Sequence, residues 1–86
     1  MGEQQMEKYS KQTVLNCIQR ELQLGSISEN DEMQRTRNWD SMGQVSLLLK
    51  LEEEFNVKFP ADQFGNLTSV KRILAYFSEE GILSDD

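Results

Sequence analysis

The segment from Ser41 to Asn56 constrains the fold more than any other part of the chain. Its apolar residues repeat with the period of an α-helix, but they form two stripes instead of one. At about 100° of rotation per residue, one stripe spans a sector about 100° wide and the other a separate sector about 60° wide. The wider stripe contains Leu47, Leu48, Leu51 and Phe55, and the narrower one contains Met42, Val45 and Leu49.

We expect the wider stripe to lie in the core and the narrower one to be exposed, because a small helical core does not need both. The narrower stripe is called the docking strip below. Glu52 and Glu53 flank it and would give an apolar binding surface an acidic rim. The alternative is that all seven apolar residues form one broad buried face.

The segment from about Glu3 to Leu24 also shows the helical period. Gly25 is expected to end this helix, because glycine accepts the left-handed conformation at a helix C-terminus at little steric cost. The apolar face of the helix contains Val14, Leu15, Ile18 and Leu22.

A third amphipathic helix is expected after the Thr68-Ser69 cap, with its end at Gly81. Its apolar face contains Val70, Ile73, Leu74 and Phe77. The residues from Pro60 to Gly65 predict a short helical turn, since proline suits the start of a helix and glycine its end. The stretch from Ser26 to Asp40 has no period and predicts a long, flexible connecting loop.

These segments predict an all-α fold, a small bundle of three long helices plus one short helix, with the long loop between the first two. Such a four-helix bundle would occupy residues 1–86 as a single domain, with residues 1–5 and 84–86 frayed. Because no stretch approaches the roughly 20 apolar residues of a membrane span, we expect no membrane insertion and a cytoplasmic protein.

The charge balance restricts the partners. The 86 residues include 15 acidic and 9 basic ones, a net charge of −6. Such a chain repels phosphate backbones, so nucleic acid is not an expected partner. A protein with a basic docking surface is expected instead. We also expect the protein to be a monomer that moves between its partners, because copies with the same acidic surface repel one another.

The absence of histidine restricts the chemistry. No Ser-His or Cys-His pair can form, and an imidazole base and most zinc sites are excluded. Cys17 is the single cysteine, and we expect it to be a small buried apolar residue. The chain is therefore not expected to be an enzyme or to bind a metal.

Asp40 and Ser41 stand where the loop meets the second helix, and two interpretations remain open. Ser41 and Gln44 could form a capping box, in which each side chain bonds the backbone of the other. Alternatively, the Ser41 hydroxyl is exposed and carries a covalently attached group. A phosphate ester there would face the positive end of the helix dipole and the unpaired N–H groups of the first turn.

The run from Trp39 to Phe55 resembles the acyl carrier protein family, whose pattern is Asp-Ser-Leu followed by an apolar helix that ends in acidic residues and phenylalanine. A short segment near Pro60 and a final Thr-Ser-Val-Lys helix follow in family order. The resemblance implies that a phosphopantetheinyl transferase attaches the 4′-phosphopantetheine arm of coenzyme A to Ser41, giving a phosphoprotein. It also implies that Asp40 helps this transferase to hold its magnesium ion and coenzyme.

The implied function is to carry acyl or aminoacyl groups as thioesters and to deliver them to loading and downstream biosynthetic enzymes. Partners would recognise the second helix, through Met42, Val45, Leu49, Glu52 and Glu53. Fatty acid, polyketide and nonribosomal peptide biosynthesis all use such carriers.

The sequence departs from the family pattern at a few positions. Met42 replaces the usual leucine, and Ser46 and Lys50 make the helix less acidic than in fatty-acid carriers. The form Trp39-Asp40-Ser41 is more similar to carriers of specialised or peptide-type pathways. The alternative function is an unmodified helical adaptor that binds a protein partner through the docking strip.

Overall fold

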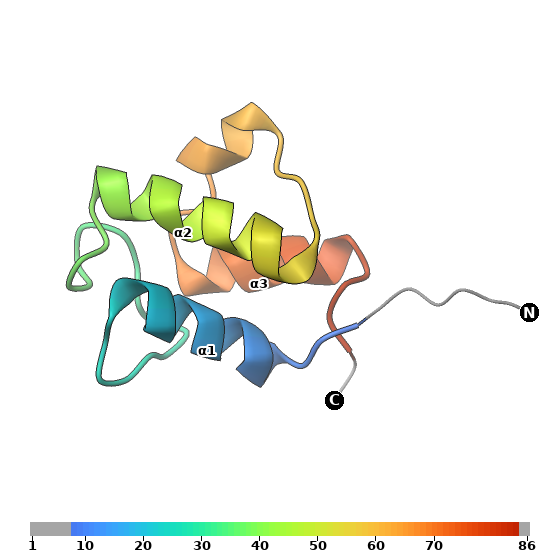
Figure 1. Ribbon diagram of the computed structural model, residues 1–86, viewed down its shortest axis with the longest axis horizontal. Helices are drawn as coiled ribbons and strands as arrows, with labels where there is room; N and C mark the ends of the chain where they lie inside the picture. Colours follow the sequence, from blue (N-terminus) through green and yellow to red (C-terminus); the bar gives the residue numbers. More distant parts are fainter. Residues whose placement is uncertain (1–7, 85–86) are drawn as a thin grey trace, which may run out of the picture.

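The computed structural model describes residues 8–84 and contains three α-helices and one 3-10 helix (Figure 1). The elements are α1 (Lys11–Leu22), α2 (Ser41–Phe55), η1 (Ala61–Gly65) and α3 (Val70–Glu79). Within the described part, pairing between extended segments is limited to two isolated bridges. The all-α class is confirmed. The four-helix bundle is wrong in one respect, because the five residues Ala61–Gly65 form only a 3-10 helix.

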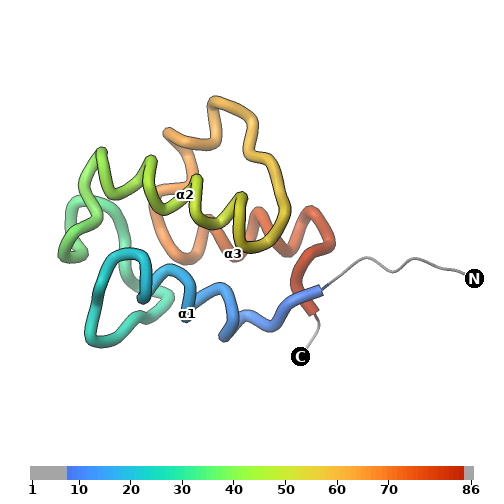
Figure 2. Tube along the Cα trace, viewed as in Figure 1, coloured from blue at the N-terminus to red at the C-terminus, as the bar shows by residue number. Residues whose placement is uncertain are grey.

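Figure 2 shows α1 and α2 side by side, with η1 on the side of α2 away from α1. α2 contacts both α1 and η1, and α1 also contacts α3. The helix predicted to have two faces therefore lies in the middle of the fold.

α1 begins later and ends earlier than the sequence predicted. Ser10 is the N-cap and its side chain accepts a hydrogen bond from the Thr13 N–H, so the helix starts at Lys11 and not near Glu3. Residues 3–7 of the predicted helix lie outside the described residues. At the other end Gln23, not Gly25, takes the left-handed conformation, with φ 57°. The ends of α1 are thus set by Ser10 and Gln23, and not by Glu3 and Gly25 as the sequence predicted.

α2 and α3 have the bounds that their periods predicted. α2 ends at Phe55, and Asn56 adopts the left-handed conformation just after it. α3 begins after Ser69, whose hydroxyl accepts from the Arg72 N–H, and the chain turns away at Gly81, with φ 75°. Both predictions are confirmed, because strong amphipathic periods and cap residues agree here.

One core joins all the elements. It includes every residue of the wider stripe of α2, and it also takes Trp39 from the connection before α2. The Phe77 ring packs against those of Phe55 and Phe59, with ring centroids 5.5 and 6.1 Å apart. The other buried apolar residues are Val14, Cys17, Ile18, Leu22, Leu47, Leu48, Leu51, Leu67, Val70, Ile73 and Leu74.

The connection between α1 and α2 is long, as predicted, but its backbone is held in place. The Met33 N–H donates to the Thr68 carbonyl (2.9 Å), and the Val70 N–H donates to the Asp31 carbonyl (3.1 Å). The Asp31 carboxylate also accepts from the Ser28 N–H and the Thr36 hydroxyl. The connection is therefore attached to the start of α3, and its last residues have a fixed position.

The two ends of the described chain lie together. The Tyr9 N–H donates to the Ile82 carbonyl, and the Ser84 N–H donates to the Tyr9 carbonyl, each at 2.8 Å. Of the segments expected to fray, residues 1–5 and 85–86 lie outside the described residues. No helix in the described part combines the length and the apolar character that crossing a membrane requires.

Candidate functional site

The site is the corner where the connection enters α2. Asp40 is the N-cap, and its Oδ1 accepts a hydrogen bond from the Gly43 N–H at 2.8 Å. Ser41 is the first residue of the helix and is exposed, and its hydroxyl has no hydrogen bond to any residue in the range 8–84. The capping box of Ser41 and Gln44 is therefore wrong, because Asp40 occupies the cap position and the Gln44 side chain points into the core.

The corner fits a phosphate ester on Ser41. The N–H groups of Ser41 and Met42 belong to the first turn, where helix geometry offers no backbone acceptor. They lie at the positive end of the helix dipole, which favours an anion by about 0.3–1 kcal/mol at an exposed position. The exposed Asp40 carboxylate stands directly before the serine.

Gly43 allows the connection to pass close to the helix. A Cβ atom at this position would overlap the carbonyl oxygen of Asn38. Asn38 has φ 66°, and its side-chain amide donates to the Leu22 carbonyl at the end of α1, at 2.7 Å. The first turn of α2 is thereby packed onto a residue that is itself bound to α1.

Gln44 is the functional candidate that the sequence analysis missed. Its side chain is 2% exposed, and its Oε1 accepts from the Trp39 indole N–H at 2.7 Å. Its Nε2 donates to the carbonyls of Phe64 and Leu67, at 3.0 and 2.8 Å. A signal was present, since a buried tryptophan needs an acceptor for its N–H and Gln44 follows Trp39 by little more than one helical turn.

The docking strip is exposed, as predicted. Met42 is 81%, Val45 47% and Leu49 52% exposed, whereas no residue of the wider stripe exceeds 3%. The alternative, one broad buried face, is wrong. Three exposed apolar side chains on one face of a helix form a patch of the kind that marks interaction sites.

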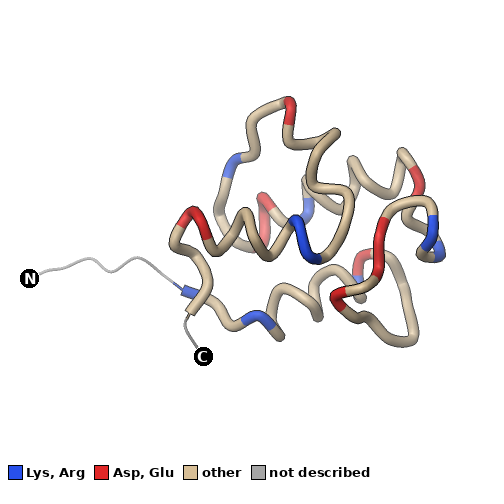
Figure 3. The backbone as a smooth tube through the Cα atoms, turned by 180° about the vertical axis from the view of Figure 1, so that it is seen from behind, with Lys and Arg blue, Asp and Glu red and all other residues tan. Residues whose placement is uncertain are grey.

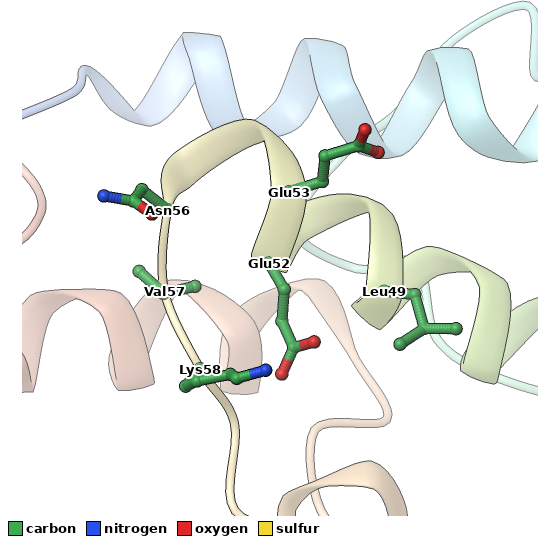
Figure 4. Close-up of a pocket in the computed structure, with 6 residues that line it drawn as sticks. All are labelled: Leu49, Glu52, Glu53, Asn56, Val57 and Lys58. Carbon is green, nitrogen blue, oxygen red and sulfur yellow. The ribbon is translucent and has the colours of Figure 1, made fainter.

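The acidic rim lies at the C-terminal end of the docking strip. An open hollow of about 440 Å³ lies there. Figure 4 draws the residues that line it, Leu49, Glu52, Glu53, Asn56, Val57 and Lys58.

The two glutamates of this rim differ in their surroundings. Glu52 is half-buried and accepts a hydrogen bond from the Phe59 N–H at 2.7 Å. Glu53 is exposed and lies 3.7 Å from the Lys50 ammonium. Glu52 thus holds the backbone after α2, and Lys50 offsets part of the charge of Glu53. Elsewhere, seen from behind, residues of both signs are spread along the chain (Figure 3).

Cys17 lies in the core, as predicted, and is 1% exposed. Burial raises the pKa of its thiol from 9.0 to about 11, and the Glu54 carboxylate adds to the effect. The thiol is therefore protonated at neutral pH and shielded from reagents. Between residues 8 and 84 no three His, Cys, Asp or Glu side chains are grouped so that they could hold a metal ion.

The comparisons with known proteins agree with this geometry. The family model described as "Phosphopantetheine attachment site" matches residues 12–77. The D-alanyl carrier proteins of Streptococcus suis strains 98HAH33 and 05ZYH33 are 40% and 39% identical to the chain over 57 residues, which are 64% of this chain and 71% of each relative. No solved structure matches the chain.

The matched range extends from the first turn of α1 to the last buried residue of α3, and so includes the whole core and the exposed corner. The chain therefore belongs to the phosphopantetheine attachment family, that of carrier proteins that hold 4′-phosphopantetheine covalently and are not themselves enzymes.

Proposed function

We propose that Ser41 is the residue that carries the 4′-phosphopantetheine arm. The observation that supports it best is an exposed serine hydroxyl without a hydrogen bond to any described residue, at the first position of a helix. Cys17, the other nucleophile singled out in the sequence, is buried. The resemblance of the run from Trp39 to Phe55 to the carrier pattern supports the same residue.

Each residue at the corner has a distinct task in this proposal. The Ser41 hydroxyl loses its proton and attacks the pantetheine-bearing phosphorus of coenzyme A. The pyrophosphate P–O bond breaks, adenosine 3′,5′-bisphosphate leaves, and the serine oxygen becomes the ester oxygen of a phosphodiester. The first-turn N–H groups favour the negative charge that the ester brings. Asp40 helps the phosphopantetheinyl transferase to hold its magnesium ion and coenzyme A, and it caps the helix. When bound, the arm supplies a terminal thiol on which cargo is held as a thioester.

We further propose that the cargo is an aminoacyl group. The relatives that support this are named as D-alanyl carrier proteins. The similarity favours an aminoacyl cargo over the acyl cargo of fatty acid or polyketide biosynthesis. The sequence form Trp39-Asp40-Ser41, which resembles carriers of specialised or peptide-type pathways, also supports an aminoacyl cargo.

The docking strip and its acidic rim are proposed to bind the transferase and the loading enzyme in turn. A small apolar patch suits a weak, short-lived complex, which a carrier needs because it must leave one enzyme before it visits the next. We propose that the carrier acts as a monomer in the cytoplasm. The adaptor without an arm is not favoured, because the chain belongs to a family defined by arm attachment.

Intact mass spectrometry tests the attachment site. After coexpression with a broad-specificity phosphopantetheinyl transferase, the parent protein should gain one phosphopantetheinyl group. Ser41→Ala should gain none, whereas Ser46→Ala, on the same helix, and Cys17→Ser should be modified like the parent. A mass gain retained in Ser41→Ala would refute the assignment.

The cargo is tested on the modified protein with an ATP-dependent ligase that activates D-alanine. The expected result is a mass gain of one alanyl group that hydroxylamine removes, as it does from thioesters. A ligase that activates a fatty acid serves as the comparison. Loading by the fatty-acid ligase alone would contradict the aminoacyl assignment and leave Ser41 unaffected.

A further inference from the structure

The buried side chain of Gln44 forms a complete hydrogen-bond network. The indole N–H of Trp39 can only donate, so it must face the oxygen of the amide. The carbonyls of Phe64 and Leu67 can only accept, so they must face its nitrogen. One acceptor and two donors on a single side chain of this length is a combination that only glutamine supplies.

This network joins the start of α2 and the nearby Trp39 to two carbonyls that lie 20 and 23 residues after Gln44 in the chain. Trp39 is the last buried residue of the connection, and Phe64 and Leu67 lie in η1 and just after it. The backbone N–H of Gln44 also closes the first turn of α2 onto the Asp40 carbonyl, at 2.8 Å. The first turn is therefore fixed by hydrogen bonds of both the backbone and the side chain of Gln44.

Ser41 depends on this support. Its hydroxyl has no hydrogen bond to any residue that the structure describes, so its position follows from the backbone of the first turn. The residue that locks this turn lies three positions further on, inside the core. Reactions of a docked nucleophile are sensitive to such placement, and a shift of about 1 Å can cost about a hundredfold in rate.

We propose that Gln44 is a positioning residue for arm attachment, which it supports by fixing the first turn of α2, and so the Ser41 hydroxyl, relative to Trp39 and η1. The proposal rests on the proposed role of Ser41. Gln44 touches neither the coenzyme nor the reacting atoms. It differs from the docking strip, whose residues should govern how tightly the transferase binds and not how well the hydroxyl is aimed.

The test is the steady-state kinetics of arm transfer with purified transferase, saturating coenzyme A and varied carrier. Gln44→Leu keeps the size of the side chain and removes its three hydrogen bonds. We expect kcat to fall at least about tenfold, a change of about 1.4 kcal/mol in activation free energy, while KM for the carrier changes less than about twofold. Leu49→Glu should show the opposite pattern, a raised KM with little change in kcat.

Ile73→Ala is the matched control for stability. Ile73 is fully buried on α3 and takes no part in the network. The variants are assayed at a temperature at which circular dichroism shows each to be folded. A parental kcat in folded Gln44→Leu, or an equal loss of kcat in Ile73→Ala, would overturn the positioning role.

Trp39→Phe keeps the test decisive if Gln44→Leu does not fold. It preserves an aromatic ring in the core but removes the indole N–H that orients the amide, together with part of the ring volume. We expect a smaller fall in kcat, again without a matching rise in KM, and an unchanged kcat would overturn the proposal. Failure of the parent protein to be modified at Ser41 would instead refute the proposed function itself.

Discussion

The two apolar faces of α2 are similar in composition and opposite in surroundings. Leu48 is fully buried, whereas Leu49, the next residue along the chain, is 52% exposed. The hydrophobicity of a leucine therefore does not decide its burial in this helix. What decides it is the direction of the side chain, because a rotation of about 100° per residue separates neighbours. One face contributes to stability, and the other remains available for a partner.

A few polar and backbone contacts hold α2 in its orientation. Gln44 faces the core and makes three buried hydrogen bonds, and Glu52 holds the Phe59 N–H at the other end of the helix. Gly43 has no side chain where the connection passes. These residues fix the helix in one orientation, so that the docking strip cannot rotate into the core.

The largest effect is expected from a pair of neighbouring substitutions. Leu48→Ala should lower the free energy of unfolding by about 2–5 kcal/mol, because it leaves a cavity in the core. Leu49→Ala should change it by no more than about 0.5 kcal/mol, as exposed positions generally do. Urea denaturation followed by circular dichroism measures both. Equal losses in the two variants would show that the faces do not differ.

A substitution at Gly43, where the connection passes close to α2, should have the next largest effect. In Gly43→Ala the new methyl group would overlap the Asn38 carbonyl, so the connection must move away from α2. We expect a loss of about 1–3 kcal/mol, typical of overpacking. Gly65→Ala is the control, since a Cβ at Gly65 has no atom within 4 Å. If both variants unfold at the same urea concentration, the close approach does not constrain the corner.

Charges placed on the docking strip should affect binding but not stability. Val45→Glu and Leu49→Glu should melt like the parent, while kcat/KM for arm transfer falls about tenfold, or about 1.4 kcal/mol, because a carboxylate would be buried without a partner in the complex. Ala75→Glu, an exposed site on α3, controls for the added charge. Unfolding of either strip variant would assign the strip to the core, and unchanged transfer would place the binding surface elsewhere.

The smallest effect concerns alkaline pH and Cys17, which packs beside the buried side of α2. Burial raises the pKa of its thiol from 9.0 to about 11, so above about pH 9 the unfolded chain loses this proton while the folded protein keeps it. The contribution of this thiol to the free energy of unfolding is fully present below pH 9.0 and falls as the pH rises toward about 11. The slope should stay below about 1.4 kcal/mol per pH unit.

Denaturation of the parent and of Cys17→Ala at a series of pH values checks this prediction. The difference between the two free energies should shrink above about pH 9. A constant difference would mean that the thiol ionises alike in the folded and unfolded protein. The docking strip consists of Met42, Val45 and Leu49, whose side chains do not titrate. Their contribution to arm transfer should therefore not change with pH as the stability does.

Local signals explain which parts of the fold could be predicted. α2 and α3 were placed correctly because a strong helical period coincided with cap residues at each end. α1 was placed less well, because its predicted period extended through the polar residues before Lys11 and Ser10 was not recognised as its N-cap. At its other end, Gln23 took the left-handed position two residues before the glycine expected there.

The sequence by itself determined which residues share a helical face and that an exposed serine follows Asp40 at the start of α2. These properties depend only on the 3.6-residue turn and on neighbours in the chain. Two of the three partners of Gln44, and the partner of Glu52, were decided by the tertiary structure alone, because they lie in η1 and in the segments around it. A polar side chain near a helix end can form hydrogen bonds either with its neighbours in the chain or with distant segments. The packing of those distant segments determines which of the two it does.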